Sequence, residues 1–307
     1  MIRKVIKSFS VGFFVAMTTY VYSQDTIPSL PELKFAEIVN KSMFLGDRWS
    51  FMEQGSKSSP VIIALHGAGG NSMDWRFQLS GLSNKFRFIA WNAPGYMLTD
   101  GFKTETPGCE DYANALLDFM NALKLDSAYL IGNSFGSRVC QCFAINHPEK
   151  VIKMALVGPS AFQLNVPDST KNKIIQGRID QIRDGGYAFG NKRVNALFGK
   201  KASPELIKTV SDHMKATNKR AFLQGTTYFV FAEGYSPTEV ATKIKNPVLL
   251  IAGEDDIVSP IDKNASVLKK ALTKVELITL KDIGHLPHLE APRVVNSLIQ
   301  DFFLKKE

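Results

Sequence analysis

The chain alternates between short, continuously apolar runs and longer segments whose apolar residues recur at helical spacing. Continuous apolar runs are typical of strands buried on both faces of a parallel sheet, and helical spacing is typical of amphipathic helices. The apolar runs are 60–67, 86–95, 126–132, 151–158, 247–253 and 274–280, and the helical segments are 110–125, 137–150 and 291–306. With two hairpin strands around 35–44 and 48–55, this order predicts an α/β fold with a mainly parallel sheet, right-handed crossovers and helices on both faces.

Residues 160–240 break the alternation. The segment is polar, basic and helix-like, and a Gly-Gly pair at 185–186 and Pro204 divide it into short helices. An insertion between two parallel strands emerges above their carboxyl ends, where ligands bind in such folds. We therefore expect a helical cap at 160–240 over a core made of 24–159 and 241–307. The cap's aromatic residues are expected partly to line the pocket and partly to form the core of the cap, with core packing favoured for each.

The N-terminus has the features of a secretory signal. A cationic start is followed by an apolar stretch through Tyr22 and a small residue, Ser23, before a polar segment. The apolar part is shorter than the roughly 20 residues that a membrane span needs. We expect a signal peptide at 1–23, cleavage before Gln24, and a periplasmic or extracellular mature protein without stable membrane insertion; an uncleaved anchor is the alternative.

Positive charge is concentrated in the middle of the chain. The formal net charge is +8, and loss of Arg3, Lys4 and Lys7 with the signal peptide would lower it to +5. We interpret the central cluster as a solvated basic helical face rather than a site for an anionic partner, and we expect no nucleic-acid partner because stacking aromatics are not interleaved with it. The cluster comprises Lys171, Lys173, Arg178, Arg183, Lys192, Arg193, Lys200 and Lys201.

Three cysteines are present, in a protein whose export would permit disulfides. Cys140 and Cys142 are two residues apart on a predicted helix, so they point to opposite sides and should not pair with each other. Cys109 lies in a loop, and its reach to either is open. We expect three unpaired, mostly buried thiols.

The stretch GNSFG at 132–136 follows a predicted buried strand and precedes a predicted helix. A nucleophile elbow has this context, because its serine sits on a tight turn between strand and helix. Gly132 and Gly136 flank Ser134 where a side chain would collide with neighbouring backbone. The pattern predicts that Ser134 is a nucleophile.

A serine nucleophile needs a base and an acid that orients the base. His285 follows the last predicted strand, which places it at the same sheet edge as the elbow, and His288 is an alternative base. Asp255 and Asp256 both follow the strand at 247–253, so either can supply the acid. The chain order of serine, acid and histidine is one of the three known arrangements of this triad.

Four motifs, HGAGG (66–70), GNSFG (132–136), GEDDIVSP (253–260) and GHLPHLE (284–290), occur in the order found in α/β-hydrolases. Together they resemble the α/β-hydrolase superfamily, close to its capped esterase and carbon–carbon hydrolase group. The resemblance implies an α/β-hydrolase sheet with a helical cap. It selects Asp256 over Asp255 through the spacing GxxDxxxP, and it implies that His285 is the base.

An oxyanion forming on the substrate needs preorganised donors about 3 Å away. The resemblance assigns one donor to the backbone N–H of Phe135 and the other to that of Ala68, with Gly69 as the alternative. His66 is expected to tie its loop together through hydrogen bonds rather than to transfer protons.

The chain departs from the family pattern at four positions. Asn92 replaces a frequent aspartate, Met97 replaces a frequent glycine, and Ser137 and Arg138 stand where a further glycine is common. We expect these changes to reshape the pocket rim or the loop packing and to leave the triad intact.

These observations predict a serine hydrolase that cleaves carboxylic esters or thioesters of small to medium apolar acyl groups through an acyl-enzyme. The same triad acting on a carbon–carbon bond, an amide or a peracid is one alternative, and a non-catalytic ligand-binding protein of this fold is another. No metal or organic cofactor is expected, because neither metal-ligand spacing nor a phosphate-binding loop is seen. The expected partner is a small apolar ester-like molecule, and the oligomeric state is open.

Overall fold

The computed structural model describes residues 26–161, 167–231 and 241–306. The predicted signal peptide at 1–23 and its cleavage site lie outside the described residues, as do parts of the predicted cap. The limits of the cap therefore remain predictions.

An eight-stranded sheet forms the centre of the molecule, in the order β1-β2-β4-β3-β5-β6-β7-β8. β2 pairs antiparallel with both β1 and β4, and every later pairing is parallel. The mainly parallel sheet predicted from the apolar runs is thus confirmed. The strands are β1 (Leu33–Glu37), β2 (Arg48–Gln54), β3 (Val61–Leu65), β4 (Arg87–Trp91), β5 (Ala128–Ser134), β6 (Val151–Pro159), β7 (Val248–Gly253) and β8 (Val275–Leu280).

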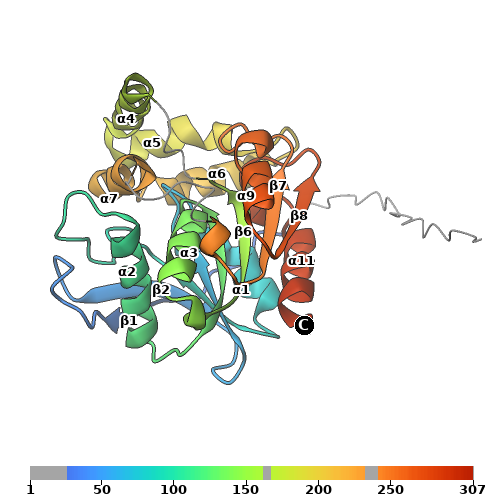
Figure 1. Cartoon of the computed structure of the whole chain (residues 1–307). Coiled ribbons are helices and arrows are strands. Elements are labelled where there is room, and N and C mark those ends of the chain that lie inside the picture. Colours follow the sequence, from blue (N-terminus) through green and yellow to red (C-terminus); the bar gives the residue numbers. More distant parts are fainter. Residues whose placement is uncertain (1–25, 162–166, 232–240, 307) are drawn as a thin grey trace, which may run out of the picture.

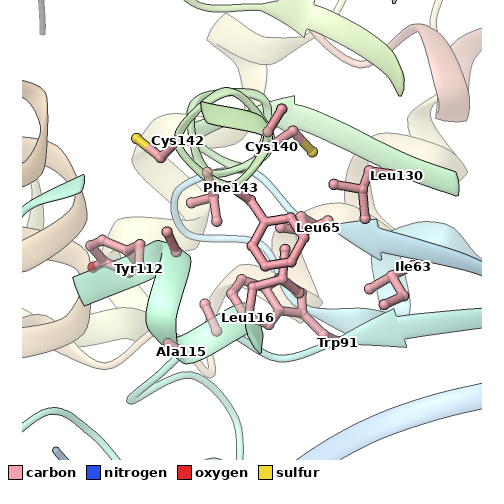
Figure 2. Close-up of a cluster of buried hydrophobic side chains, with 14 of the residues drawn as sticks. Ile63, Leu65, Trp91, Tyr112, Ala115, Leu116, Leu130, Cys140, Cys142 and Phe143 are labelled. Carbon is pink, nitrogen blue, oxygen red and sulfur yellow. The ribbon is translucent and has the colours of Figure 1, made fainter. Parts of the chain in front are cut away.

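Helices cover both faces of the sheet because successive strand residues point to opposite sides. In β3, Ile63 and Leu65 enter the core shared with α2, α3 and α9, whereas Ile62 and Ala64 enter the core shared with α1 and α11. Figure 2 shows the first core, with Phe143 of α3 beside Trp91 of β4 and Leu116 of α2. These helices are α1 (Arg76–Leu82), α2 (Cys109–Ala122), α3 (Phe135–Asn146), α9 (Ala265–Ala271) and α11 (Pro292–Leu304), with the short α10 (Pro287–Glu290) before the last.

Four of the described helices between β6 and β7 form what we call the cap. Figure 1 shows them gathered at one end of the molecule, above the sheet. Phe189 and Phe222 pack edge to face in an apolar cluster that also includes Phe77 and Leu286 of the core. The expectation of packing in the cap's own core holds only in part, because Phe229 packs on Tyr112 of the core and Tyr187 is exposed. The cap helices are α4 (Asp168–Ile182), α5 (Gly185–Arg193), α6 (Pro204–Met214) and α7 (Lys219–Leu223), followed by a π-helical turn at Gln224–Tyr228.

The expectation of three unpaired thiols is wrong. Cys109 and Cys142 form a disulfide, and only Cys140 is free among the three. Cys109 is the first residue of α2, and the packing of α2 against α3 brings its Cα to 5.5 Å from that of Cys142. Cys140 and Cys142 lie on different sides of α3, as predicted (Figure 2).

None of the helices in the described ranges combines the length and the apolar character that a membrane span requires.

Candidate active site

The predicted nucleophile lies at the junction of β5 and α3. Ser134 has φ 52°, a left-handed conformation that is costly for a residue with a side chain and is often found at functional sites. A Cβ at Gly132 would lie 2.5 Å from the carbonyl oxygen of Gly136, and a Cβ at Gly136 would collide with the carbonyl of Leu65. The tight turn therefore requires both glycines, as the sequence indicates.

The structure brings Asp256, not Asp255, to the predicted base. Asp256 Oδ2 accepts a hydrogen bond of 2.7 Å from His285 Nδ1. Its Oδ1 accepts from the backbone N–H groups of Val258 and Ser259, each at 2.8 Å. Asp255 instead approaches Lys200, with 4.0 Å between carboxylate and ammonium.

Burial opposes the ionisation of Asp256, but the charge and hydrogen bond of His285 and the two backbone donors outweigh it. The pKa of this carboxyl therefore lies below its ordinary value. An ionised Asp256 accepts the Nδ1 proton of His285, which leaves Nε2 with the lone pair.

His285 is buried and is held through its backbone as well as its ring. Its N–H donates to Leu197 O at 2.7 Å, and its carbonyl accepts from Asn133 Nδ2 at 3.2 Å. Nε2 makes no hydrogen bond with a described residue, and His285 lines the same small pocket as Ser134. The predicted serine, acid and base thus come together at the carboxyl ends of β5, β7 and β8.

His288, the alternative base, lies elsewhere. Its ring stacks on Trp75 with 4.4 Å between centroids, and it lines neither pocket beside Ser134. Burial lowers the pKa of His288 to about 4. Its surroundings are those of a packed core histidine.

The loop after β3 lies against the nucleophile, since a Cβ at Gly67 would lie 3.5 Å from the Cβ of Ser134. Ala68 lines the pocket together with Ser134 and Phe135, which places both proposed oxyanion donors beside the predicted nucleophile. Gly69 has φ 86°, and its carbonyl accepts from the hydroxyl of Thr217 in the cap at 2.8 Å.

His66 holds this loop in place, as expected. Its Nε2 accepts from the N–H of Ala93 at 3.1 Å, so its Nδ1–H donates to Gly67 O at 2.8 Å. Burial lowers the pKa of His66, which favours this neutral ring.

A buried polar network joins cap and core below this loop. Arg76 Nη2 donates to His213 Nε2 at 3.0 Å, and His213 Nδ1 contacts Asp74 Oδ1 at 3.3 Å. Asp74 Oδ2 also accepts from the N–H of Asn71 at 3.2 Å. The sequence does not reveal this network, because 139 positions separate Asp74 from His213 and no motif connects them.

Glu290 was also missed. Its carboxylate accepts from the N–H groups of Gly199 at 2.8 Å and Gly284 at 2.9 Å, linking the segment after α5 to the loop that carries His285. Burial raises the pKa of Glu290 to about 7.

A cavity of about 240 Å³ opens beside Ser134 between core and cap. Arg178 and Arg193 line it, so the interpretation of the central basic cluster as a solvated face is wrong for these two residues. Arg138, one of the departures from the family pattern, also reaches the cavity, as expected of a change at the pocket rim. The other lining residues are Ala68, Ser134, Phe135, Ser160, Ile174, Gly225, Thr226, Val230, Val258, Ser259 and Asn264.

The chain was compared with known proteins. It is 27% identical over 260 residues to a 2-hydroxy-6-oxononadienedioate/2-hydroxy-6-oxononatrienedioate hydrolase of Paraburkholderia phymatum, covering 79% of this chain and 86% of that protein. It is 23% identical over 268 residues to Lipase 1 of Psychrobacter immobilis, covering 83% and 80%. The solved structure of the carboxylesterase CesB from Bacillus subtilis has a similar fold, with a TM-score of 0.75, 21% identity, and coverage of 92% of this chain and 94% of that one.

The model of the α/β-hydrolase fold family matches residues 60–292, a range that begins just before β3 and includes the elbow, Asp256 and His285. Together with the sheet order and the cap, this match establishes that the chain belongs to the α/β-hydrolase fold family.

Proposed function

We propose that the protein is a serine hydrolase that cleaves small to medium carboxylic esters or thioesters through an acyl-enzyme. The observation that carries this proposal is the placement of Ser134 on a strained elbow beside the hydrogen-bonded pair of His285 and Asp256.

In this mechanism, Nε2 of His285 accepts the proton of the Ser134 hydroxyl while the hydroxyl oxygen of Ser134 attacks the ester carbonyl. The N–H groups of Phe135 and Ala68 donate to the oxyanion of the tetrahedral intermediate. His285 then gives the proton to the departing alcohol, which leaves an acyl group on Ser134. Water activated by the same histidine releases the acid, and Asp256 stabilises the charged ring in both steps.

The name of Lipase 1 supports hydrolysis of an ester. The name of the Paraburkholderia relative favours a second candidate, in which the same Ser134, Asp256 and His285 cleave a carbon–carbon bond. The ratio of kcat/KM for a simple ester to that for a carbon–carbon substrate separates the two, because the same triad can be acylated by either and only the preference differs.

We also propose that residues 1–23 direct export. The disulfide between Cys109 and Cys142 supports this proposal, because such bonds persist in oxidising compartments.

The proposed function is tested with a chain-length series of p-nitrophenyl esters, using the protein from Gln24 onward and a Ser134→Ala control. We expect the wild-type protein to turn over the short and medium esters. The control should lose at least about 10³-fold in kcat, because the residual rate after loss of a triad member is small. If both proteins are folded and neither turns over any ester, carbon–carbon cleavage or ligand binding becomes the better account.

A further inference from the structure

Three guanidinium groups line the cavity beside Ser134, and they come from three different helices. Arg138 is four residues beyond Ser134 on α3 and is only 6% exposed. Its Nε donates to Ser160 Oγ at 3.0 Å and its Nη2 donates to Ala161 O at 2.9 Å. These two bonds hold the cation at the wall of the cavity.

Arg178 of α4 and Arg193 of α5 come from the cap. Both donate to the same neutral acceptor, Oε1 of Gln181, at 3.1 and 3.3 Å. Arg193 also lies over the ring of Phe189, at 5.9 Å from its centroid. Neither arginine forms an ion pair with a carboxylate of the described residues, so neutral groups hold both side chains in place.

The described residues that line the cavity include no Asp or Glu beside Arg178 and Arg193. Burial and the nearby charge of Arg178 lower the pKa of Arg138 and of Arg193 to about 9. Gathering like charges in a partly dehydrated site costs free energy unless an anion joins them. A ligand with a negative group would supply this missing charge.

The two pockets beside Ser134 share Ala68, Ser134 and Arg193, but Arg138 and Arg178 line only the larger one. His285, which must protonate the leaving alcohol, lines the smaller one. The larger, arginine-lined cavity contains Ser134 and Phe135 but not His285. Ser134 lines both pockets, so an acyl group attached to it can extend into the larger cavity while the alcohol leaves past His285.

We propose that the arginine-lined cavity binds a carboxylate at the far end of the acyl group, so that the preferred substrates are monoesters of small dicarboxylic acids. This inference rests on the proposed function. The planar guanidinium fork of arginine matches the two oxygens of a carboxylate, which lysine matches less well. An anionic acyl group thus takes the place of the apolar acyl group expected from the sequence.

The test compares mono-p-nitrophenyl glutarate with its methyl ester, which lacks the negative charge and carries one more methyl group, at neutral pH where the free carboxyl is ionised. We expect the wild-type protein to prefer the acid in kcat/KM. Arg178→Gln should lower the ratio of the two kcat/KM values about 10- to 100-fold, mainly through KM, because a charge-assisted hydrogen bond is lost. Arg178→Lys should restore part of the preference.

Arg183→Gln is the matched control, because Arg183 follows the same helix but is exposed and pairs with Asp180. It should keep the wild-type ratio. A wild-type protein that prefers the neutral ester, or an Arg178→Gln variant with an unchanged ratio, would overturn the inference.

If neither ester is turned over, the proposed function fails, and binding of glutarate to the wild-type protein then tests the cavity by calorimetry. Binding that is weakened in Arg178→Gln and kept in Arg183→Gln supports the carboxylate site. Absence of binding by the folded wild-type protein overturns it.

Discussion

Two histidines three residues apart have different environments, which determine what each ring can do. His285 donates to the ionised Asp256 and leaves Nε2 at the small pocket beside Ser134. His288 stacks on Trp75, and its Nδ1 has no partner among the described residues. The first ring is suited to proton transfer, whereas the second remains neutral and contributes packing.

The neutral His288 should make the protein less stable in acid. Because its folded pKa of about 4 lies below the ordinary 6.5, the unfolded state binds a proton that the folded state does not, and stability falls as the pH decreases from 6.5 to about 4. His288→Phe keeps a ring on Trp75 and removes this titration. As the pH decreases from 6.5 to about 4, the free energy of unfolding of the variant minus that of the wild-type protein should therefore rise by on the order of 3 kcal/mol.

Urea denaturation at several pH values between 4 and 7 measures this difference. If the free energies of unfolding of the two proteins changed with pH in parallel, His288 would not be the cause of the loss of stability in acid. Other buried groups such as His66 are common to both proteins and cancel in the comparison.

At the residue scale, the sequence predicts best where a position follows a strand end. Ser134 ends β5, and Asp256 and His285 follow β7 and β8, so the parallel sheet brings them to one edge. Arg178 and Arg193 could not be placed in this way, because the direction of a side chain on a polar cap helix depends on how the cap packs on the core. Their spacing on α4 and α5 carries no such signal.

At the element scale, α2 and α3 are packed together and covalently linked. The disulfide joins the first residue of α2 to α3 across a sequence separation of 33. A cross-link of this length stabilises a protein mainly by restricting its unfolded chain.

Cys142→Ser should lower the free energy of unfolding by about 3–4 kcal/mol, the amount that a loop of this length implies. Urea denaturation with and without dithiothreitol measures it. Reductant should destabilise the wild-type protein and Cys140→Ser alike, and it should have no effect on Cys142→Ser. Finding three reactive thiols in the unfolded, unreduced wild-type protein would contradict the disulfide.

Strands with an apolar run were predicted well, including the partly exposed β8, whereas the shortest helices and the first strand were not. The continuous apolar runs gave every parallel strand to within a few residues. The helices α1 and α9 were missed because each has only seven residues, too few for a clear helical period. The first strand lies at Leu33–Glu37 rather than around 35–44, and its mostly exposed residues show no apolar run.

For the whole molecule, the core is proposed to carry the chemistry and the cap to carry much of the substrate preference. The core supplies the predicted triad and oxyanion donors from strand ends, and the cap supplies two of the three arginines of the acyl cavity. Contacts between Thr217 and Gly69, and between His213 and Asp74, join the cap to the loop beside the nucleophile. Substrate preference should therefore follow changes in the cap, whereas loss of chemistry should follow changes in the core.

The central claim is that Ser134 is an activated nucleophile, and covalent labelling tests it without knowledge of the substrate. The protein is treated with a fluorophosphonate, which phosphonylates serines that have a positioned base, and the product is examined by intact-mass and peptide mass spectrometry. The account predicts one adduct per chain, located on Ser134 and absent from the folded Ser134→Ala variant. A folded wild-type protein that takes up no label, or takes it up at another residue, would contradict the account.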